Sequence, residues 1–273
     1  MAFGLRIAFY LIAGYALFTA ALYLAQRKMM YFPAQHLPTP IEAGLAVAHT
    51  VKLHTADGLD LLAWHVPAKP DSNLPTIVYL HGNGGNIAGR THRVRPLVAN
   101  GYGVLQVEYR GYAGNPGSPT EQGLYADARA GLDFLKSEGI GPTDIVLLGE
   151  SLGSGVAVEM AAELGRAGTP VKALVLEAPY TSTTDVAAGV YWFLPVRALM
   201  KDKFESLDKI GDIDTALLVI HGEHDRTIPV VLGQRLLAAA SEPRTGIFIP
   251  SAGHNDLAGH GSDRHILDFL AAR

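Results

Sequence analysis

The stretch "DIVLLGESLGSG", Asp144 to Gly155, decides the fold. Its first half is a continuous apolar run, which is typical of a strand covered on both faces. Its second half carries G-x-S-x-G at Gly149 to Gly153 and continues into a helical segment. A serine flanked by glycines at such a strand–turn–helix junction is typical of a nucleophile elbow, because the turn leaves room only for small neighbours. We therefore expect the Ser151 hydroxyl to stand above the sheet edge, at a helix N-terminus that favours negative charge.

Strands and helices alternate along most of the remaining chain. Strands are predicted at 48–55, 59–67, 76–81, 103–109, 144–150, 171–179, 216–222 and 246–250, and helices at about 87–100, 118–137, after 151, from 229 and from 262. The first two strands are joined by a hairpin turn signal and should pair antiparallel. The alternation that follows predicts an α/β fold with a mostly parallel, doubly wound sheet. Ser118, Pro119 and Glu121 have the spacing of a helix start with a capping box.

An uncharged apolar run, Ile7 to Ala25, lies near the N-terminus. As a helix it would be about 28 Å long, close to the thickness of a bilayer's hydrocarbon core. A buried core helix and a cleaved signal peptide are the alternatives, but the possible cleavage site at Thr19 to Ala21 lies inside the run, which disfavours cleavage. Basic residues flank both ends almost equally, so no orientation is predicted. We expect a single-pass transmembrane anchor at 1–32, a proline-bearing linker at 33–47, and a membrane localisation.

Composition excludes several classes of protein. The formal net charge is -4 and no basic stripe is present, so a nucleic-acid partner is not expected. The absence of cysteine excludes disulfides, thiolate zinc sites and cysteine nucleophiles. The glycine loop "GNGGN" (82–86) contains neither a P-loop nor a G-x-G-x-x-G pattern, which argues against nucleotide binding.

A serine hydroxyl is a poor nucleophile unless a base activates it and a carboxylate orients that base. In a sheet of this kind the partners follow the serine in the order Asp or Glu, then His, each after a later strand. Asp225 follows the strand that ends near His221, and His254 follows the strand that ends near Pro250. Both positions lie at strand C-termini, where ligand sites of such sheets form. The predicted catalytic set is Ser151, Asp225 and His254.

Other carboxylates could take the place of the acid. Glu223 is the main rival and Asp256 a weaker one; Asp225 is preferred because it sits deeper in its loop, ahead of Pro229. Glu150 lies beside the serine but should point away from the substrate, since neighbouring side chains at a turn diverge.

A metal site is a further alternative by residue type. It would use His221, His224, His254 and Asp225, but their spacing fits no metal motif. No metal or other cofactor is therefore expected.

The segments "HGNGGN", "GESLGSG", "HGEHDRTIP" and "SAGHND" resemble those of the α/β-hydrolase superfamily over residues 48 to 272. "YFPAQ", "YRGYAGNPGSPTEQGLYADA" and "APYTS" are similar to its membrane-anchored branch, the bud-emergence and abhydrolase-domain hydrolases, often grouped with serine aminopeptidase-like or monoacylglycerol lipase-like hydrolases. Ala113 and Asn115 depart from the usual Gly/Ser run of that loop. The resemblance implies an α/β-hydrolase fold at 48–273 and an esterase, lipase or acyl thioesterase activity.

The resemblance also implies an oxyanion hole. It would use the backbone N–H groups of Leu152, after the nucleophile, and of Asn83, after His81-Gly82, with His81 bracing the loop. For Asn83 the backbone amide should matter more than the side chain.

A small cap is expected at about 181–214, between two strands of the sheet. Its aromatic residues Tyr191, Trp192 and Phe193 could form an apolar wall for an acyl chain, or could pack the cap onto the core. We expect a serine hydrolase acting on carboxylic esters or thioesters, with lipid-derived acyl groups as substrates. A peptidase or amidase on the same residues, and a non-catalytic interaction protein, are the alternatives.

Overall fold

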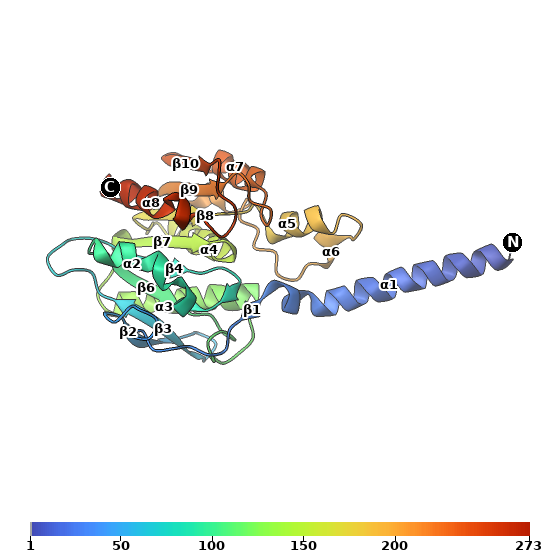
Figure 1. Ribbon diagram of the computed structural model, residues 1–273, viewed down its shortest axis with the longest axis horizontal. Coiled ribbons are helices and arrows are strands. Elements are labelled where there is room, and N and C mark those ends of the chain that lie inside the picture. The colour runs from blue at the N-terminus through green and yellow to red at the C-terminus, as the bar shows by residue number, and fades with distance from the viewer. Residues whose placement is uncertain (1) are drawn as a thin grey trace.

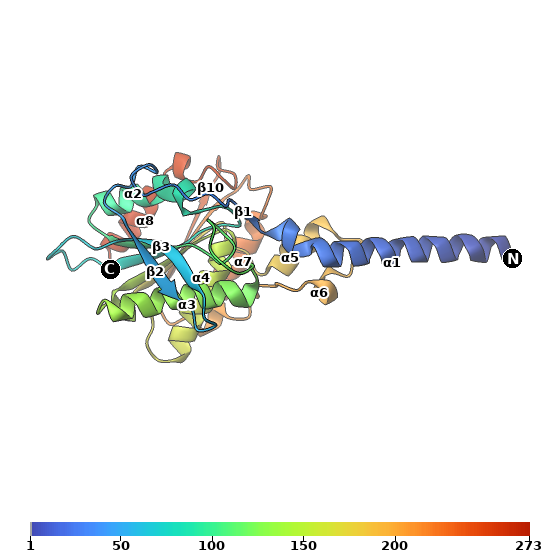
Figure 2. The same cartoon turned by 90° about the horizontal axis from the view of Figure 1, so that it is seen from below.

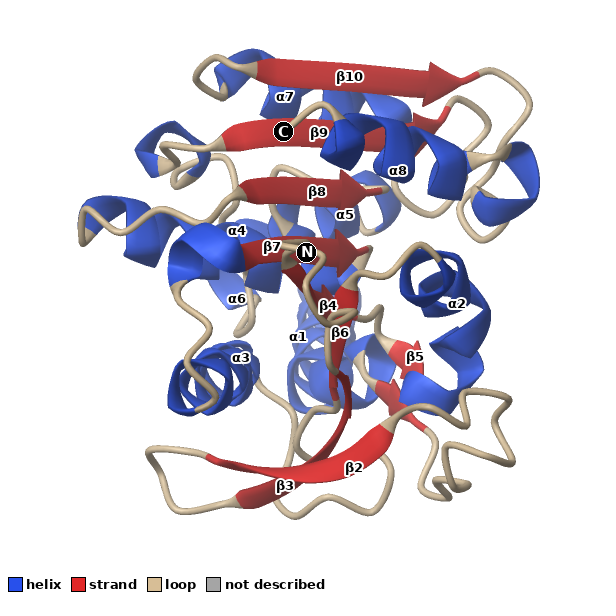
Figure 3. Cartoon of the chain, turned by 90° about the vertical axis from the view of Figure 1, so that its left-hand side faces the viewer, coloured by secondary structure: helices blue, strands red, loops and turns tan. Residues whose placement is uncertain are grey.

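The computed structural model describes residues 2–273 and is built around an eight-stranded sheet (Figures 1 and 3). The strand order is β10-β9-β8-β7-β4-β6-β3-β2. The pairs β2·β3 and β3·β6 are antiparallel and the remaining pairs are parallel, which confirms the predicted sheet with its antiparallel start. The strands are β2 (His49–His54), β3 (Asp60–Val66), β4 (Thr76–Leu80), β6 (Gly103–Val107), β7 (Ile145–Glu150), β8 (Ala173–Glu177), β9 (Ala216–Gly222) and β10 (Arg244–Ile249).

Helices cover both faces of the sheet. One face packs on α2 (Thr91–Ala99) and α8 (Ser262–Ala271), the other on α3 (Glu121–Ser137), α4 (Leu152–Arg166) and α7 (Val230–Ala239). Short 3₁₀ turns are η1 (Ile87–Arg90), η2 (Pro142–Asp144), η3 (Ile210–Asp212) and η4 (Ala258–His260). Every residue of β4, β6 and β8 is buried. Burial on both faces explains why these strands read as continuous apolar runs rather than as alternating ones.

The start of α3 differs from the prediction. Thr120, not Ser118, is the N-cap: its Oγ1 accepts a hydrogen bond from the Gly123 N–H at 3.0 Å, and the helix begins at Glu121. The carboxylate of Glu121 accepts a hydrogen bond from the Lys203 N–H at 2.7 Å, which places it against a distant loop. Ser118 and Thr120 both carry a hydroxyl that can cap a helix, so the local sequence does not decide between them. The contact between Glu121 and Lys203 accompanies the start of the helix at Glu121.

The N-terminal helix α1 (Ala2–Met30) projects away from the sheet as a long rod (Figures 1 and 2). Large apolar side chains along it, among them Leu5, Tyr10 and Leu17, are exposed, so α1 is not a core helix. Phe3–Met30 is long and apolar enough to cross a membrane. The end of α1 nearest the sheet lies beside α5 (Thr183–Val190) and α6 (Val196–Leu199), which occupy the chain between β8 and β9 (Figure 2). We call the segment of about 181–214, which contains α5 and α6, the cap.

Directly after α1, the chain pairs with the glycine loop. The two-residue strands β1 (Phe32–Pro33) and β5 (Gly84–Gly85) form a small parallel sheet of their own. The Phe32 N–H donates to the Asn83 carbonyl at 2.9 Å, and the Ala34 N–H donates to the Gly85 carbonyl at 2.9 Å. The exit from α1 is therefore hydrogen-bonded to the loop that follows β4.

Candidate active site

Ser151 occupies a sharp turn between β7 and α4. Its φ of 51° and ψ of -118° are unusual for a residue other than glycine, and its N–H donates to the Glu177 carbonyl of the neighbouring strand at 2.9 Å. A Cβ atom on Gly153 would lie 2.0 Å from the Leu80 carbonyl oxygen, and one on Gly149 would lie 2.5 Å from the Gly153 oxygen. Both glycines are therefore required by backbone contact, as the motif predicted.

The structure brings the three predicted catalytic residues together from three separate loops. Ser151 Oγ lies 3.0 Å from His254 Nε2, and His254 Nδ1 lies 2.7 Å from Asp225 Oδ2. A carboxylate only accepts hydrogen bonds, so Nδ1 of the imidazole carries the proton and Nε2 can accept one from the serine hydroxyl. This arrangement allows the imidazole to remove the serine proton.

Asp225 is held as an anion by three hydrogen bonds and by a close contact with His221, whose Nε2 also lies 2.9 Å from the Ile228 carbonyl. Its Oδ1 accepts the Thr227 and Ile228 N–H groups, each at 2.8 Å, while Oδ2 faces His254 and, at 3.2 Å, the Nε2 of His221. Burial opposes ionisation, but the contacts with His221, His254 and Ile228 outweigh it and hold the pKa of Asp225 well below its usual range. His221 is thus a buried support for the carboxylate.

The alternative carboxylates lie away from this imidazole. Glu223 is exposed, and Asp256 accepts a hydrogen bond at 2.7 Å from the backbone of its own loop. Glu150 is turned toward the Arg90 guanidinium, whose Nε lies 3.1 Å away. Among residues 2–273, Asp225 is the only carboxylate within hydrogen-bonding distance of the imidazole.

The glycine loop after β4 lies next to the serine. His81 is fully buried and fixes the loop through the Gly82 carbonyl, 2.7 Å from Nδ1, and the Glu108 carboxylate, 3.0 Å from Nε2. The Asn83 side chain donates to the Met30 carbonyl, the last residue of α1, at 2.7 Å. Within the described chain, the backbone N–H groups of Asn83 and of Leu152 meet no acceptor.

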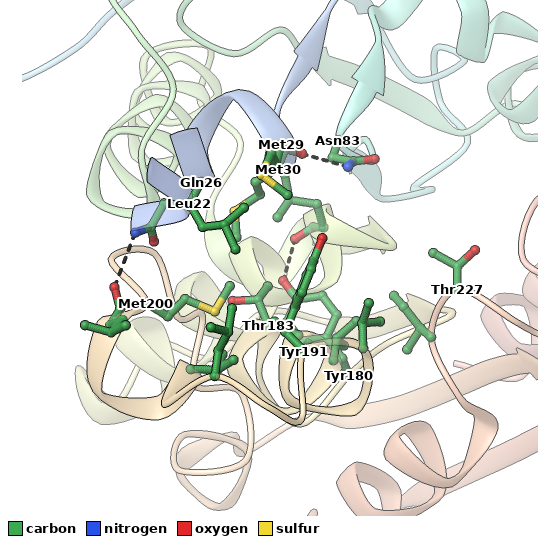
Figure 4. Close-up of a pocket in the computed structure, with 18 of the residues that line it drawn as sticks. Leu22, Gln26, Met29, Met30, Asn83, Tyr180, Thr183, Tyr191, Met200 and Thr227 are labelled. Carbon is green, nitrogen blue, oxygen red and sulfur yellow. Dashed lines mark hydrogen bonds between the residues drawn. The ribbon is translucent and has the colours of Figure 1, made fainter. Parts of the chain in front are cut away.

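A cavity of about 440 Å³ opens beside Ser151 and includes Asn83 and Leu152 in its lining (Figure 4). Its volume lies within the roughly 300–1,000 Å³ range of small-molecule sites. Most of its other side chains are apolar. The other lining residues, polar and apolar together, come from α1 (Thr19, Leu22, Tyr23, Gln26, Met29, Met30), from the chain between β8 and β9 (Tyr180, Thr183, Val186, Ala187, Val190, Tyr191, Leu194, Val196, Leu199, Met200) and from the loop after β9 (Arg226, Thr227, Ile228).

Of the three aromatic residues predicted to bind substrate, only Tyr191 lines this cavity. Trp192 is 82% exposed, and the Phe193 ring stacks on Phe18 of α1 with 6.5 Å between ring centroids. The α1 side chains of the lining were not predicted. A helix that is apolar on all sides gives no sequence signal for the face that packs.

The sequence is similar to that of known hydrolases. The sequence model of the α/β hydrolase family matches residues 77–203. An uncharacterised protein of Mycobacterium tuberculosis is 38% identical over 232 residues, which cover 85% of this chain and 81% of that one. The lysophosphatidylserine lipase ABHD12 of Danio rerio is 33% identical over 252 residues, covering 78% of this chain and 65% of that one.

Solved structures share the fold at lower identity. The Pyrococcus furiosus esterase Pf2001 superimposes with a TM-score of 0.69 at 19% identity, over 89% of this chain and 98% of that one. An alpha-beta hydrolase from Vibrio vulnificus gives 0.69 at 23% identity, over 85% and 88% of the two chains. The sequence is related to these proteins over most of its length, and the sheet has the fold of the solved hydrolases. The protein is therefore a hydrolase of the α/β-hydrolase family, with a candidate membrane anchor at its N-terminus.

Proposed function

We propose that the protein is a membrane-anchored serine hydrolase that cleaves carboxylic esters or thioesters of lipid-derived acyl groups. The observation that carries this proposal is the hydrogen-bonded path from Asp225 through His254 to Ser151, which ends in a largely apolar cavity. No cofactor takes part in the proposed reaction.

The proposed reaction proceeds through an acyl-enzyme. Ser151 Oγ attacks the acyl carbon while His254 Nε2 takes its proton, and Asp225 stabilises the imidazolium that forms. His254 then returns the proton to the leaving alcohol or thiol. A water molecule, deprotonated by the same imidazole, attacks the acyl-enzyme and releases the acid.

The backbone N–H groups of Asn83 and Leu152 are the proposed oxyanion hole. Both belong to the lining of the cavity that contains Ser151, and neither has an acceptor among residues 2–273. Donors aimed at a developing oxyanion stabilise the transition state, and removal of one such donor typically costs about 3 kcal/mol.

A lipid with one acyl chain and an anionic head group fits the site best. The apolar side chains of the cavity can contact the acyl chain of the lipid. The one charged residue of the lining, Arg226, is exposed and has no ion-pair partner among residues 2–273, so it can face an anionic head group. The Danio rerio relative is named for an anionic lysolipid of this kind. A preference for lysophosphatidylserine over lysophosphatidylcholine that disappears in Arg226→Gln would support this head-group assignment.

The proposal retains α1 as a single-pass anchor, with residues 1–32 as anchor, 33–47 as linker and 48–273 as a catalytic domain that carries the cap at about 181–214. Its support is that α1 contributes to the cavity lining and is hydrogen-bonded to the cap. Mass spectrometry of the protein from membranes tests it: cleavage after Ala21 would contradict a retained anchor.

Covalent labelling tests the catalytic mechanism directly. A fluorophosphonate probe should label the wild-type protein at Ser151 and leave Ser151→Ala unlabelled. Equal labelling of both contradicts the assignment of Ser151 as the nucleophile, and labelling of neither favours a non-catalytic interaction protein. A panel of p-nitrophenyl esters and aminoacyl anilides then separates an esterase from a peptidase or amidase, because only the esters should be turned over efficiently.

A further inference from the structure

The membrane helix forms one wall of the cavity beside Ser151. Its residues Thr19, Leu22 and Gln26 line the cavity and follow one another at spacings of three and four, which places them on one face of α1. Figure 4 shows Leu22 and Gln26 of this face. Leu24, two residues from Leu22, does not line the cavity and is 76% exposed. Only one side of the anchor therefore faces the site.

Specific polar contacts hold this face against the cap. Arg27 makes a two-pronged ion pair with the buried carboxylate of Asp202, at 2.7 and 3.0 Å. Gln26 uses both ends of its amide: its nitrogen donates to the Leu199 carbonyl at 3.3 Å, and its oxygen accepts the Lys201 N–H at 2.8 Å. Directional contacts of this kind fix the position of the helix relative to the cap, which a merely tethering anchor would not need.

The turn between α5 and α6, residues 191–195, reaches far along α1, and we call it the cap tip. The Tyr15 hydroxyl donates to the Phe193 carbonyl at 2.9 Å. Tyr15 stands near the middle of the uncharged run 7–25, about 15 Å from its C-terminal end at Ala25, which is half the thickness of the hydrocarbon layer of about 30 Å. When α1 spans the bilayer, the cap tip therefore lies inside one leaflet. The exposed Trp192 side chain then meets lipid instead of water.

We propose that the cavity binds one fatty acyl chain, that α1 is a wall of this site, and that the chain enters sideways from the leaflet at the cap tip. The proposal rests on the function proposed above. The α1 wall extends from Met30, next to Asn83, to Thr19, about 16 Å along the helix axis. An acyl chain that moves from the bilayer along this wall leaves contacts with lipid tails and gains contacts with apolar side chains, and it is not exposed to water on the way. The anchor thereby selects acyl chains in addition to holding the enzyme at the membrane.

Two tryptophan substitutions on α1 test the wall. In the full-length protein in phosphatidylcholine nanodiscs, kcat/KM is measured for p-nitrophenyl acetate and p-nitrophenyl decanoate. The larger side chain of Leu22→Trp occupies part of the cavity beside α1, while Leu24→Trp is the matched control on the exposed face of the helix. Each methylene excluded from an apolar site costs about fourfold in kcat/KM. We expect the decanoate-to-acetate ratio to fall by roughly 15-fold in Leu22→Trp, for about two methylenes excluded, and to stay at the wild-type value in Leu24→Trp.

The same decanoate-to-acetate ratio in both variants and the wild type would overturn the wall while leaving the hydrolase intact. If the wild type shows no hydrolysis that depends on Ser151, the proposed function itself fails. Should thermal unfolding show that Leu22→Trp does not fold, Leu22→Ala replaces it and should lower the same ratio a few-fold through lost contacts.

Fluorescence tests the depth of the cap tip without any activity. The chain has two tryptophans, of which Trp64 is buried and Trp192 is exposed. The emission of Trp192, taken as the difference between wild type and Trp192→Phe, should be quenched by phosphatidylcholine with brominated acyl chains and protected from aqueous iodide. Quenching by iodide alone would place the cap tip in water and overturn entry from the leaflet.

Discussion

Replacement of Asp225 by asparagine is the sharpest test of the proposed catalytic path, because it exchanges one atom and leaves the shape of the side chain unchanged. In the wild-type protein Oδ1 accepts two backbone N–H groups at 2.8 Å and Oδ2 accepts His254 Nδ1–H at 2.7 Å. The amide oxygen of the asparagine must take the Oδ1 position, since an NH₂ group there would face two N–H donors. The NH₂ group is therefore forced against His254 Nδ1.

That NH₂ group donates, so the imidazole can only accept at Nδ1 and must carry its proton on Nε2. Nε2 lies 3.0 Å from Ser151 Oγ and can then no longer take the serine proton. Loss of the correct tautomer in a serine–histidine–aspartate set lowers kcat by about 10⁴, equivalent to about 5.4 kcal/mol of transition-state stabilisation.

The assay is steady-state hydrolysis of p-nitrophenyl butyrate by the full-length protein, together with the rate of fluorophosphonate labelling. Glu223→Gln is the matched control, because it removes an exposed carboxylate from the same loop and should leave both rates within about twofold. Activity of Asp225→Asn within tenfold of the wild type would refute the reasoning. An equal loss in Glu223→Gln would move the role of the acid to Glu223.

Three further predictions concern the elbow, the glycine loop and pH. Gly153→Ala places a Cβ atom 2.0 Å from the Leu80 carbonyl oxygen, so thermal unfolding should show a loss of about 3 kcal/mol or more and labelling should disappear. Asn83→Ala keeps its backbone N–H but loses the hydrogen bond to the Met30 carbonyl, so kcat/KM should fall by no more than about tenfold. The lowered pKa of Asp225 adds stability above its unfolded pKa near 4, and this stability is lost as pH falls further. The gap in unfolding free energy between wild type and Asp225→Asn should therefore narrow from pH 7 to pH 3.

Each of these predictions has a control or a contrary outcome. Gly141→Ala should unfold as the wild type does, because no atom lies within 4 Å of its added Cβ and its φ is -84°. Activity as low in Asn83→Ala as in Ser151→Ala would assign the Asn83 side chain a larger role. A stability gap that is constant between pH 7 and pH 3 would show that Asp225 gains nothing from its donors.

The centre of the sheet could be predicted from the sequence because β4, β6 and β8 are buried on both faces and therefore consist of continuous apolar runs. Ser151, Asp225 and His254 could be named for a related reason. Each lies in the loop that follows a strand, within a few residues of the strand's end. The C-terminal ends of parallel strands meet at one edge, so order along the chain translates into proximity in space.

Three kinds of contact could not be predicted: those between very short strands, those of a helix that is apolar on all sides, and those between segments far apart in the sequence. The β1–β5 pair joins strands of only two residues each, too short to show any periodicity, across some fifty positions of chain. The run Ile7 to Ala25 of α1 is apolar on all sides, so its sequence does not show which face of the helix packs. Thr120 rather than Ser118 starts α3, in a structure where Glu121 contacts the Lys203 backbone, which lies far along the sequence.

The pairing of β4 with β7 also has a consequence for biosynthesis. Leu80 and Gly149 are neighbours across the sheet although 69 residues separate them in the chain, so the glycine loop cannot meet the elbow until β7 has left the ribosome. His254, the proposed proton acceptor, is synthesised later still. With α1 as the proposed anchor, a nascent chain that is already inserted in the bilayer therefore carries no complete set of the proposed catalytic residues. Under the proposed function, the membrane is exposed to hydrolysis only by chains that have finished folding.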